Sequence, residues 1–131
     1  MQNVRIDTES GAQDMLFTWA MWQQGARPEL ELLHHIPNGG KRDARTGRAL
    51  KRQGVKAGVP DLCLPVARGG FHGLYIELKV GNNTTSPRQK EWISNLGQQG
   101  YCARVCRGWE EAKETIEGYL DGKIQRKEEE E

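Results

Sequence analysis

Two strand-like runs separated by a short glycine-rich segment place the tightest constraint on the fold of this chain. The runs span residues 61–66 and 73–80, and the connection at 68–72 is short enough for a β-hairpin. Side chains alternate between the faces of a strand, so Glu77 and Lys79 share one face while Ile76 and Leu78 point into an apolar layer. The sequence therefore predicts an antiparallel pair of strands that carries charged groups on one face.

The segments around this hairpin predict helices packed around a small sheet. Apolar residues at helical spacing predict a helix over residues 8–24, and a Ser-Pro start followed by glutamine predicts a second helix over about 86–98. Further strands are expected at 30–36 and 101–106, and a last helix at 109–120. This order predicts an α/β fold with a small mixed β-sheet flanked by helices.

The length of the chain is that of one small domain. For 131 residues we expect a single domain over 1–122, followed by a charged, disordered tail over 123–131. No run approaches the roughly 18 apolar residues of a membrane span, and the N-terminus lacks a signal-peptide core. The three cysteines form no metal-binding spacing and are expected to be buried thiols. We therefore expect a soluble cytoplasmic protein that does not bind membranes.

The net charge of +1 conceals a segregation of charge along the chain. Residues 39–60 carry a net charge of +6, whereas 1–38 carry −3 and 110–131 carry −5. The basic block, which we expect to form a helix or a partly mobile arm, has the cation density of a phosphate-binding surface. An ordinary solvated helix face is the alternative. The candidate phosphate contacts are Lys41, Arg42, Arg45, Arg48, Lys51, Arg52 and Lys56.

Asp61, Glu77 and Lys79 together supply the groups that hydrolysis of a phosphodiester requires. Asp61 and Glu77, on paired strands, present hard oxygen ligands suited to one Mg²⁺ or Mn²⁺, and the backbone carbonyl of Leu78 and waters would complete the coordination. Lys79 would reach the same pocket, where its ammonium can orient the attacking water and offset phosphate charge, or act as a base. The pattern predicts a metal-dependent active site.

The sequence Gly58-Val59-Pro60-Asp61, followed by Glu77-Leu78-Lys79, resembles the core motif of the PD-(D/E)XK nucleases. Segments 36–42, 54–58, 73–77 and 86–92 are similar, more specifically, to the VRR-NUC branch of that superfamily. The resemblance implies a restriction-endonuclease-like core and nuclease activity on structured DNA, with the basic block as DNA contact. It also implies a relation to small stand-alone phage and bacterial proteins, similar to Holliday junction resolvases, that act as homodimers in the cytoplasm of a bacterium or a phage-infected cell.

The resemblance extends the candidate catalytic site to Glu9 and Gln89. The family pattern has an acidic residue on the first helix, and Glu9 is the candidate here, reaching the metal through water; Glu29 and Glu31 are the alternatives. A favourable interaction with the helix dipole would also explain Glu9. Gln89 corresponds to a glutamine that touches the active-site water or phosphate in related nucleases, and a capping-box role explains it equally well.

Other residues with chemical potential have simpler explanations. The adjacent His34 and His35 would face opposite sides of a strand, so at most one could enter the site. The four tryptophans, Trp19, Trp22, Trp92 and Trp109, are expected in core or dimer contacts, with base stacking as the alternative.

The leading hypothesis from the sequence is a Mg²⁺- or Mn²⁺-dependent endonuclease that cuts branched DNA. A nicking or duplex-specific endonuclease of the restriction type would use the same chemistry, and a DNA-binding accessory protein would use the basic block alone. The presence of Asp61, Glu77 and Lys79 together argues against the accessory role, because a retired active site has no reason to keep all three.

Overall fold

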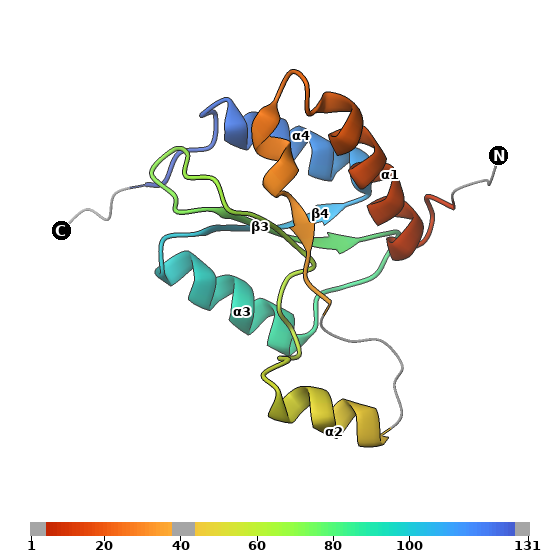
Figure 1. Ribbon diagram of the computed structural model, residues 1–131. Coiled ribbons are helices and arrows are strands. Elements are labelled where there is room, and N and C mark those ends of the chain that lie inside the picture. Colours follow the sequence, from red (N-terminus) through yellow and green to blue (C-terminus); the bar gives the residue numbers. More distant parts are fainter. Residues whose placement is uncertain (1–4, 38–43, 128–131) are drawn as a thin grey trace.

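The computed structural model describes residues 5–37 and 44–127, and the structural statements below refer to these residues. Four strands form one mixed sheet in the order β1-β2-β3-β4, with helices around it (Figure 1). The α/β fold class predicted from the sequence is confirmed. In chain order the elements are α1 (Glu9–Gln23), the 3-10 helix η1 (Pro28–Leu32), β1 (His34–His35), α2 (Ala44–Arg52), β2 (Leu62–Leu64), β3 (Leu74–Lys79), α3 (Pro87–Gln98), β4 (Cys102–Arg107) and α4 (Trp109–Leu120).

The predicted hairpin forms the centre of the sheet. Strands β2 and β3 are antiparallel, with Leu62 opposite Ile76 and Leu64 opposite Leu74. Strand β4 runs parallel to β3, which requires a crossover, and α3 provides it. The crossover places α3 on one face of the sheet, while α1 and α4 lie together on the other (Figure 1). The result is a sheet between two helical layers.

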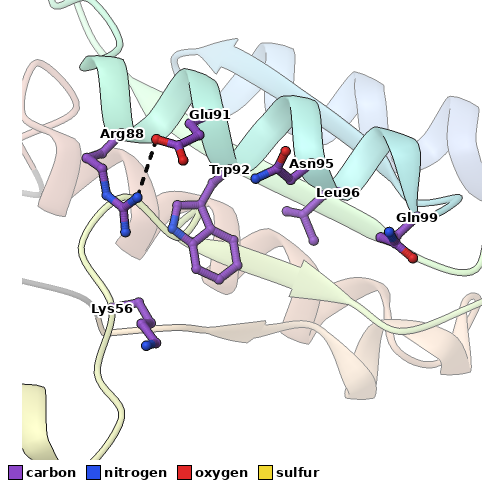
Figure 2. A pocket seen from close by; sticks show the side chains of 7 residues that line it. All are labelled: Lys56, Arg88, Glu91, Trp92, Asn95, Leu96 and Gln99. Atoms are coloured by element: carbon purple, nitrogen blue, oxygen red, sulfur yellow. Dashed lines mark hydrogen bonds and ion pairs between the residues drawn. The ribbon is translucent and has the colours of Figure 1, made fainter.

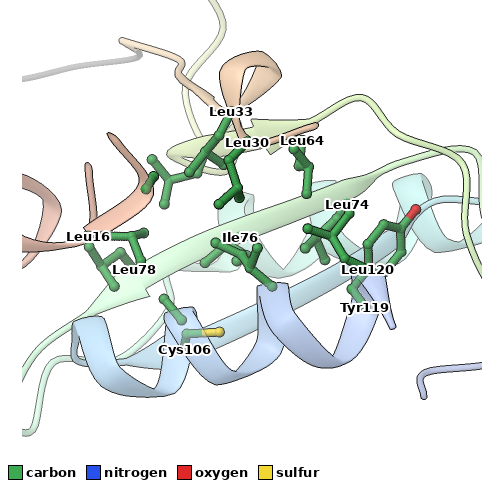
Figure 3. Close-up of a cluster of buried hydrophobic side chains, with 14 of the residues drawn as sticks. Leu16, Leu30, Leu33, Leu64, Leu74, Ile76, Leu78, Cys106, Tyr119 and Leu120 are labelled. Atoms are coloured by element: carbon green, nitrogen blue, oxygen red, sulfur yellow. The ribbon is translucent and has the colours of Figure 1, made fainter. Parts of the chain in front are cut away.

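The hydrophobic core lies between the sheet and the layer formed by α1 and α4. Leu16 of α1, Ile76 of β3 and Ile116 of α4 are fully or almost fully buried in it, and Tyr119 lies among them (Figure 3). The Tyr119 hydroxyl donates a hydrogen bond of 2.6 Å to the backbone carbonyl of Val66, so the polar end of this buried ring is satisfied. Because side chains alternate along β3, Glu77 and Lys79 point away from this core, to the face on which α3 lies.

Capping residues explain where two of the helices begin. Helix α1 starts after Thr8, whose side chain accepts a hydrogen bond from the backbone N–H of Gly11. Helix α3 starts after Ser86 with a complete capping box: the Ser86 hydroxyl accepts from the Gln89 N–H, and the Gln89 side chain accepts from the Ser86 N–H. The predicted helix starts are thus confirmed.

The prediction of a strand over residues 30–36 was largely wrong. Pro28 begins a 3-10 helix, in which Leu30 and Leu33, three residues apart, are buried, whereas Leu32 is 51% exposed. An alternating strand would have buried Leu30 and Leu32 together. Only His34 and His35 pair with β2 as a short strand.

The chain beyond α4 is fixed further than expected. Residues 123–127, which we predicted to belong to a disordered tail, follow a defined path against the hairpin loop. The Arg126 N–H donates to the Gly69 carbonyl at 2.7 Å, and Ile124 packs against the core. Gly69 has φ +58°, and a side chain there would collide with the Ile124 carbonyl. The remaining tail residues 128–131 lie outside the described residues.

The basic helix α2 stands apart from the core, as Figure 1 shows, and none of its residues is buried. The chain returns from α2 to the sheet through Gly58, which has φ +91° and lies directly against the start of α3. A Cβ atom at Gly58 would come within 2.8 Å of the Arg88 backbone. This close approach fixes the path of the chain into Pro60 and Asp61. None of the described helices is long and apolar enough to serve as a membrane span.

The cysteines and tryptophans divide between core and surface. Cys63, Cys102 and Cys106 are free, buried thiols, as predicted. Trp19 and Trp109 pack against the core, whereas Trp22 is 79% exposed. Trp92, on α3, is half-buried.

Candidate active site

Asp61 lies just before β2 and is held in place from two sides. Its backbone carbonyl accepts hydrogen bonds from the Ile36 N–H at 2.6 Å and contacts His35 Nδ1 at 2.9 Å. Its carboxylate accepts from the Leu78 N–H at 2.9 Å. The β2–β3 ladder ends at the Leu62–Ile76 pair, so the Asp61 side chain takes over the Leu78 donor just beyond that end. The Leu78 carbonyl points to the same edge of β3 as its N–H, and therefore toward Asp61.

Glu77 is the most buried charged side chain of the site, with 2% of its surface exposed. One carboxylate oxygen, Oε1, accepts a hydrogen bond from Gln89 Nε2 at 2.9 Å. The other, Oε2, is buried and has no hydrogen-bond partner within the described part of the chain. A buried carboxylate oxygen without a partner is costly, and it marks a position where a cation would be stabilised.

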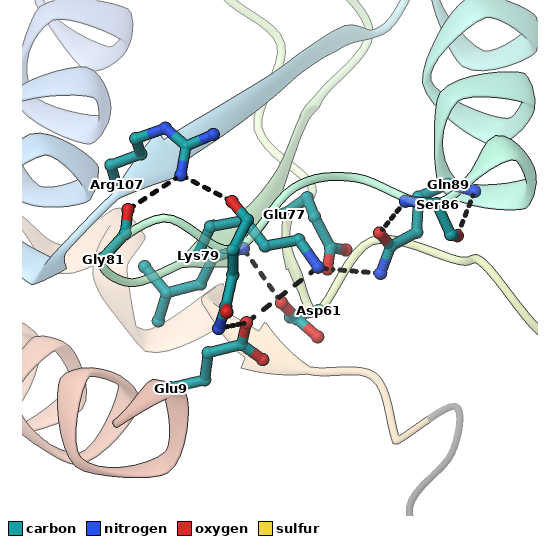
Figure 4. A network of polar contacts seen from close by, with 10 residues as sticks. Glu9, Asp61, Glu77, Lys79, Gly81, Ser86, Gln89 and Arg107 are labelled. Carbon is teal, nitrogen blue, oxygen red and sulfur yellow. Dashed lines mark hydrogen bonds and ion pairs between the residues drawn. The ribbon is translucent and has the colours of Figure 1, made fainter. Parts of the chain in front are cut away.

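Lys79 joins Glu77 to Glu9, as Figure 4 shows. The Lys79 ammonium lies 3.6 Å from Glu77 Oε1 and 3.9 Å from Glu9 Oε1. Glu9 is on the first turn of α1, and its side chain is 43% exposed. The structure thus brings Glu9 to the edge of the site, whereas Glu29 lies elsewhere and pairs with Arg68 at 3.1 Å.

The loop after β3 contributes two residues that the sequence did not single out. Asn83 Nδ2 donates to Glu9 Oε1 at 3.3 Å, and Arg107 donates to the backbone carbonyls of Asn83 and Gly81 at 2.6 and 3.1 Å. Arg107 therefore holds the loop, and the loop holds Glu9. Asn83 follows a glycine-containing turn, which by sequence alone suggests only a change of chain direction.

Gln89 performs both roles that its position suggested. Its Oε1 accepts from the Ser86 N–H at 2.8 Å and completes the cap of α3, while its Nε2 holds Glu77. One amide therefore couples the start of α3 to the orientation of the Glu77 carboxylate.

The two carboxylates shift each other's ionisation. Burial, followed by the charge of Asp61, raises the pKa of Glu77 from 4.5 to about 8, although Lys79 opposes the shift. Burial also raises the pKa of Asp61, against the lowering effect of the Leu78 N–H. Two carboxylates that resist ionisation together form a site that gains stability from a bound cation.

The residues present fit a divalent ion. Asp61 and Glu77 offer hard oxygen atoms, Glu77 Oε2 lacks a partner, and the Leu78 carbonyl faces the same side. Within the described ranges no three His, Cys, Asp or Glu side chains cluster closely enough to enclose a metal. An ion held here would therefore keep several water ligands, as Mg²⁺ commonly does.

The basic residues lie outside this cluster. Arg45, Arg48, Lys51 and Arg52 are exposed on α2, and Lys56 is exposed on the segment that follows. None of these five cations forms an ion pair within residues 5–37 and 44–127. Lys41 and Arg42, the other two predicted contacts, lie outside the described residues. Of the two histidines, His35 contacts the Asp61 carbonyl and His34 Nδ1 contacts the Leu32 carbonyl, so neither contact is made to a carboxylate.

Comparison with known proteins gives this arrangement a family. The model of the VRR-NUC domain matches residues 7–110. The chain belongs to the VRR-NUC domain family. This VRR-NUC chain is also similar to a solved structure described as a VRR_NUC domain protein, with 36% sequence identity, a TM-score of 0.77 and coverage of 93% of each chain. A comparison with curated proteins found no match.

Family membership confirms the resemblance found in the sequence and the nuclease-like α/β core. All of the residues that meet at the site, from Glu9 to Gln89, lie within the part of the chain that the VRR-NUC model matches. A VRR-NUC domain indicates a nuclease-type, DNA-processing function.

Proposed function

We propose that this VRR-NUC chain is a divalent-metal-dependent endonuclease that hydrolyses phosphodiester bonds in branched, Holliday-junction-like DNA. The observation that carries the proposal is the meeting of Asp61 and the buried Glu77 with Lys79, where one Glu77 oxygen has no hydrogen-bond partner in the described part of the chain. A structural ion pair would use both oxygens. An oxygen left open beside a second carboxylate is suited to a metal ligand.

Asp61, Glu77 and the Leu78 carbonyl would hold Mg²⁺ or Mn²⁺. When bound, such an ion neutralises charge on the phosphate and lowers the pKa of a coordinated water. The protein holds its ligands before any ion arrives: the Leu78 N–H fixes the Asp61 carboxylate, and Gln89 fixes Glu77. Groups fixed in advance need little reorganisation during the reaction, which is the main source of electrostatic catalysis.

Lys79 would act on the attacking water and the phosphate. Its ammonium is 7% exposed and is held between Glu77 and Glu9, so it can donate to an oxygen that enters from the open side of the site. Glu9 is too exposed for a tightly enclosed ligand and would reach the ion through water. Asn83 would keep Glu9 in this position.

The basic surface supports DNA as the substrate. The four α2 cations and Lys56 project from the body without acidic partners among the described residues, as expected for groups that contact phosphates. We propose that two copies act together, because a two-fold symmetric dimer matches two symmetric cuts across a four-way junction. The exposed apolar side chains Met21, Trp22 and Leu32 offer a contact surface for the second copy.

The proposal is tested by cleavage across a panel of labelled DNA: a four-way junction, a flap, and a linear duplex of the same sequence, each with Mg²⁺, Mn²⁺ or EDTA. Cleavage of the junction should require the ion. Asp61→Asn keeps an acceptor for the Leu78 N–H but loses the charge, and we expect more than about a hundredfold loss of rate. Glu29→Gln, which removes a carboxylate away from the site, is the matched control and should cut normally.

The outcomes separate the alternatives. An intact junction at every enzyme and metal concentration would refute nuclease activity and leave a DNA-binding accessory role. Equal cutting of junction and linear duplex would identify an enzyme of the restriction or nicking type. Full activity of Asp61→Asn would show that the site is elsewhere.

A further inference from the structure

A pocket on the outer side of α3 lies next to the candidate active site but takes no part in it. Its volume is about 370 Å³, within the range of small-molecule sites. Figure 2 shows the Trp92 indole between α3 and the segment that carries Lys56. The lining residues are Lys56, Arg88, Glu91, Trp92, Asn95, Leu96 and Gln99.

The position of the pocket links it to the site. Arg88 lies next to Gln89, whose amide holds Glu77, and Trp92 follows Arg88 by one helical turn. On the opposite wall, Gly58 packs directly against the Arg88 backbone, so the segment from Lys56 into Asp61 runs along the same groove. DNA held by the α2 cations and cut at Asp61 would pass this pocket.

Trp92 is poorly explained by packing alone. Helix α3 has no buried residue, and Trp92 and Leu96 are only half-buried although they are its large apolar side chains on this face. A tryptophan is usually well buried, so one that remains open in a groove between polar side chains is suited to a flat partner.

The surrounding groups match the parts of a nucleotide. The indole offers a stacking surface, and Asn95 and Gln99, one and two turns along the same helical face, carry amides that can donate to and accept from a base edge. Lys56 and Arg88 supply positive charge for the phosphate. Glu91 pairs with Arg88 at 3.3 Å, and its carboxylate can accept from the exocyclic amino group of a base.

From this combination we infer that the Trp92 pocket binds an unpaired nucleotide of the DNA, stacked on the indole. This inference rests on the proposed function, because it assigns a subsite to the same DNA-binding face. Paired bases in a duplex are stacked on each other and cannot enter, whereas a base at a branch point or bulge can. The pocket would thus contribute to the recognition of branched DNA.

The experiment measures binding, not cleavage, in EDTA. Fluorescence anisotropy gives the affinities for a duplex with one bulged nucleotide and for the same duplex fully paired, and the ratio of the two is the readout. We expect wild-type protein to prefer the bulged duplex by roughly tenfold, as base stacking on an aromatic side chain provides. Trp92→Ala should bring the ratio close to one, while Trp92→Phe, which keeps a stacking ring, should retain most of it.

A second pair of variants does not depend on removing a large side chain. Asn95→Ala and Gln99→Ala change exposed residues of the pocket, and each should lower the ratio by about fivefold at most, the value of one hydrogen bond. Gln98→Ala removes an exposed amide next to Gln99 that does not line the pocket, and it should leave the ratio unchanged. Loss of preference in Gln98→Ala as well would overturn the inference.

Further outcomes keep this inference separate from the proposed function. Wild-type protein that cuts junctions with Mn²⁺ but binds bulged and paired duplex equally would overturn the pocket and leave the nuclease standing. A preference for the bulge without any cleavage would do the reverse. If Trp92→Ala changes the molecular mass in solution instead of the ratio, the face is a contact between two copies and the inference is wrong.

Discussion

Replacement of Glu77 by glutamine is expected to flatten the pH dependence of stability of the metal-free protein. Glu77 is 2% exposed, and its Oε2 has no hydrogen-bond partner in the described structure. Burial and the neighbouring charge of Asp61 raise its pKa from 4.5 to about 8. Glutamine has nearly the same shape and can still accept a hydrogen bond from Gln89, but it carries no charge to desolvate.

The sign follows from proton binding. The folded protein holds the Glu77 proton more tightly than the unfolded chain does, so the contribution of this group to stability is complete below about pH 4.5 and is lost as the pH rises through about 8. One pH unit between these two pKa values corresponds to about 1.4 kcal/mol. Between pH 6 and pH 8 this group should therefore lower the free energy of unfolding of the wild type by about 2 kcal/mol.

Urea unfolding monitored by tryptophan fluorescence, in EDTA at pH 6, 7 and 8, measures this effect. Wild type, Glu77→Gln and the surface control Glu29→Gln are compared by the change of their unfolding free energies with pH. Using the change cancels the loss of individual contacts, since that loss is similar at each pH. Glu29→Gln should parallel the wild type, because Glu29 pairs with Arg68 at the surface. If Glu77→Gln also parallels the wild type, Glu77 does not bear the burden assigned to it.

Addition of Mn²⁺ extends the same experiment to the proposed ion. A cation between Asp61 and Glu77 favours the ionised form of both, so it should stabilise the wild type at pH 8 and stabilise Glu77→Gln much less. Equal stabilisation of both proteins would place the ion somewhere else.

Three further outcomes are expected. Arg48→Ala removes one exposed cation of α2 and should lower the slope of log binding constant against log salt concentration by about 1, measured by anisotropy on paired duplex; an unchanged slope would exclude Arg48 from the phosphate contacts. Tyr119→Phe leaves the buried Val66 carbonyl without its donor and should cost about 1 to 2 kcal/mol of unfolding free energy in urea, whereas an unaltered midpoint would contradict the value placed on that bond. Trp22→Glu places a charge in the apolar surface near the end of α1 and should convert the proposed homodimer to a monomer by light scattering; a wild type that is already monomeric would rule out the dimer.

The sequence predicted best those elements whose signals are local. The capping box of α3 needs only Ser86 and Gln89, and the β2–β3 hairpin needs only a short loop between two apolar runs, so both were found. The segment from Pro28 to Leu33 failed because its leucines suit either a strand or a 3-10 turn, and packing against α1 decided between them. The local sequence does not contain that information.

The same division applies to the candidate site. Asp61, Glu77 and Lys79 follow from strand alternation and hairpin pairing, which sequence spacing reveals. Asn83 could not be found in this way, because its contact with Glu9 joins two residues 74 positions apart and exists only after α1 has packed against the sheet. The choice of Glu9 over Glu29 came from a family resemblance, and the fold supplies its physical reason: Glu29 is turned toward Arg68.

The path of residues 123–127 has a practical consequence for studies in solution. Arg126 is tied to Gly69 in the loop at the start of β3, whereas Lys79 is the last residue of that strand. A strand of six residues separates these two ends by about 20 Å. A fusion partner or surface anchor joined after Lys127 would therefore leave the protein at the end remote from the carboxylates. Immobilised or dye-labelled protein prepared in this way should keep its catalytic face accessible to long DNA.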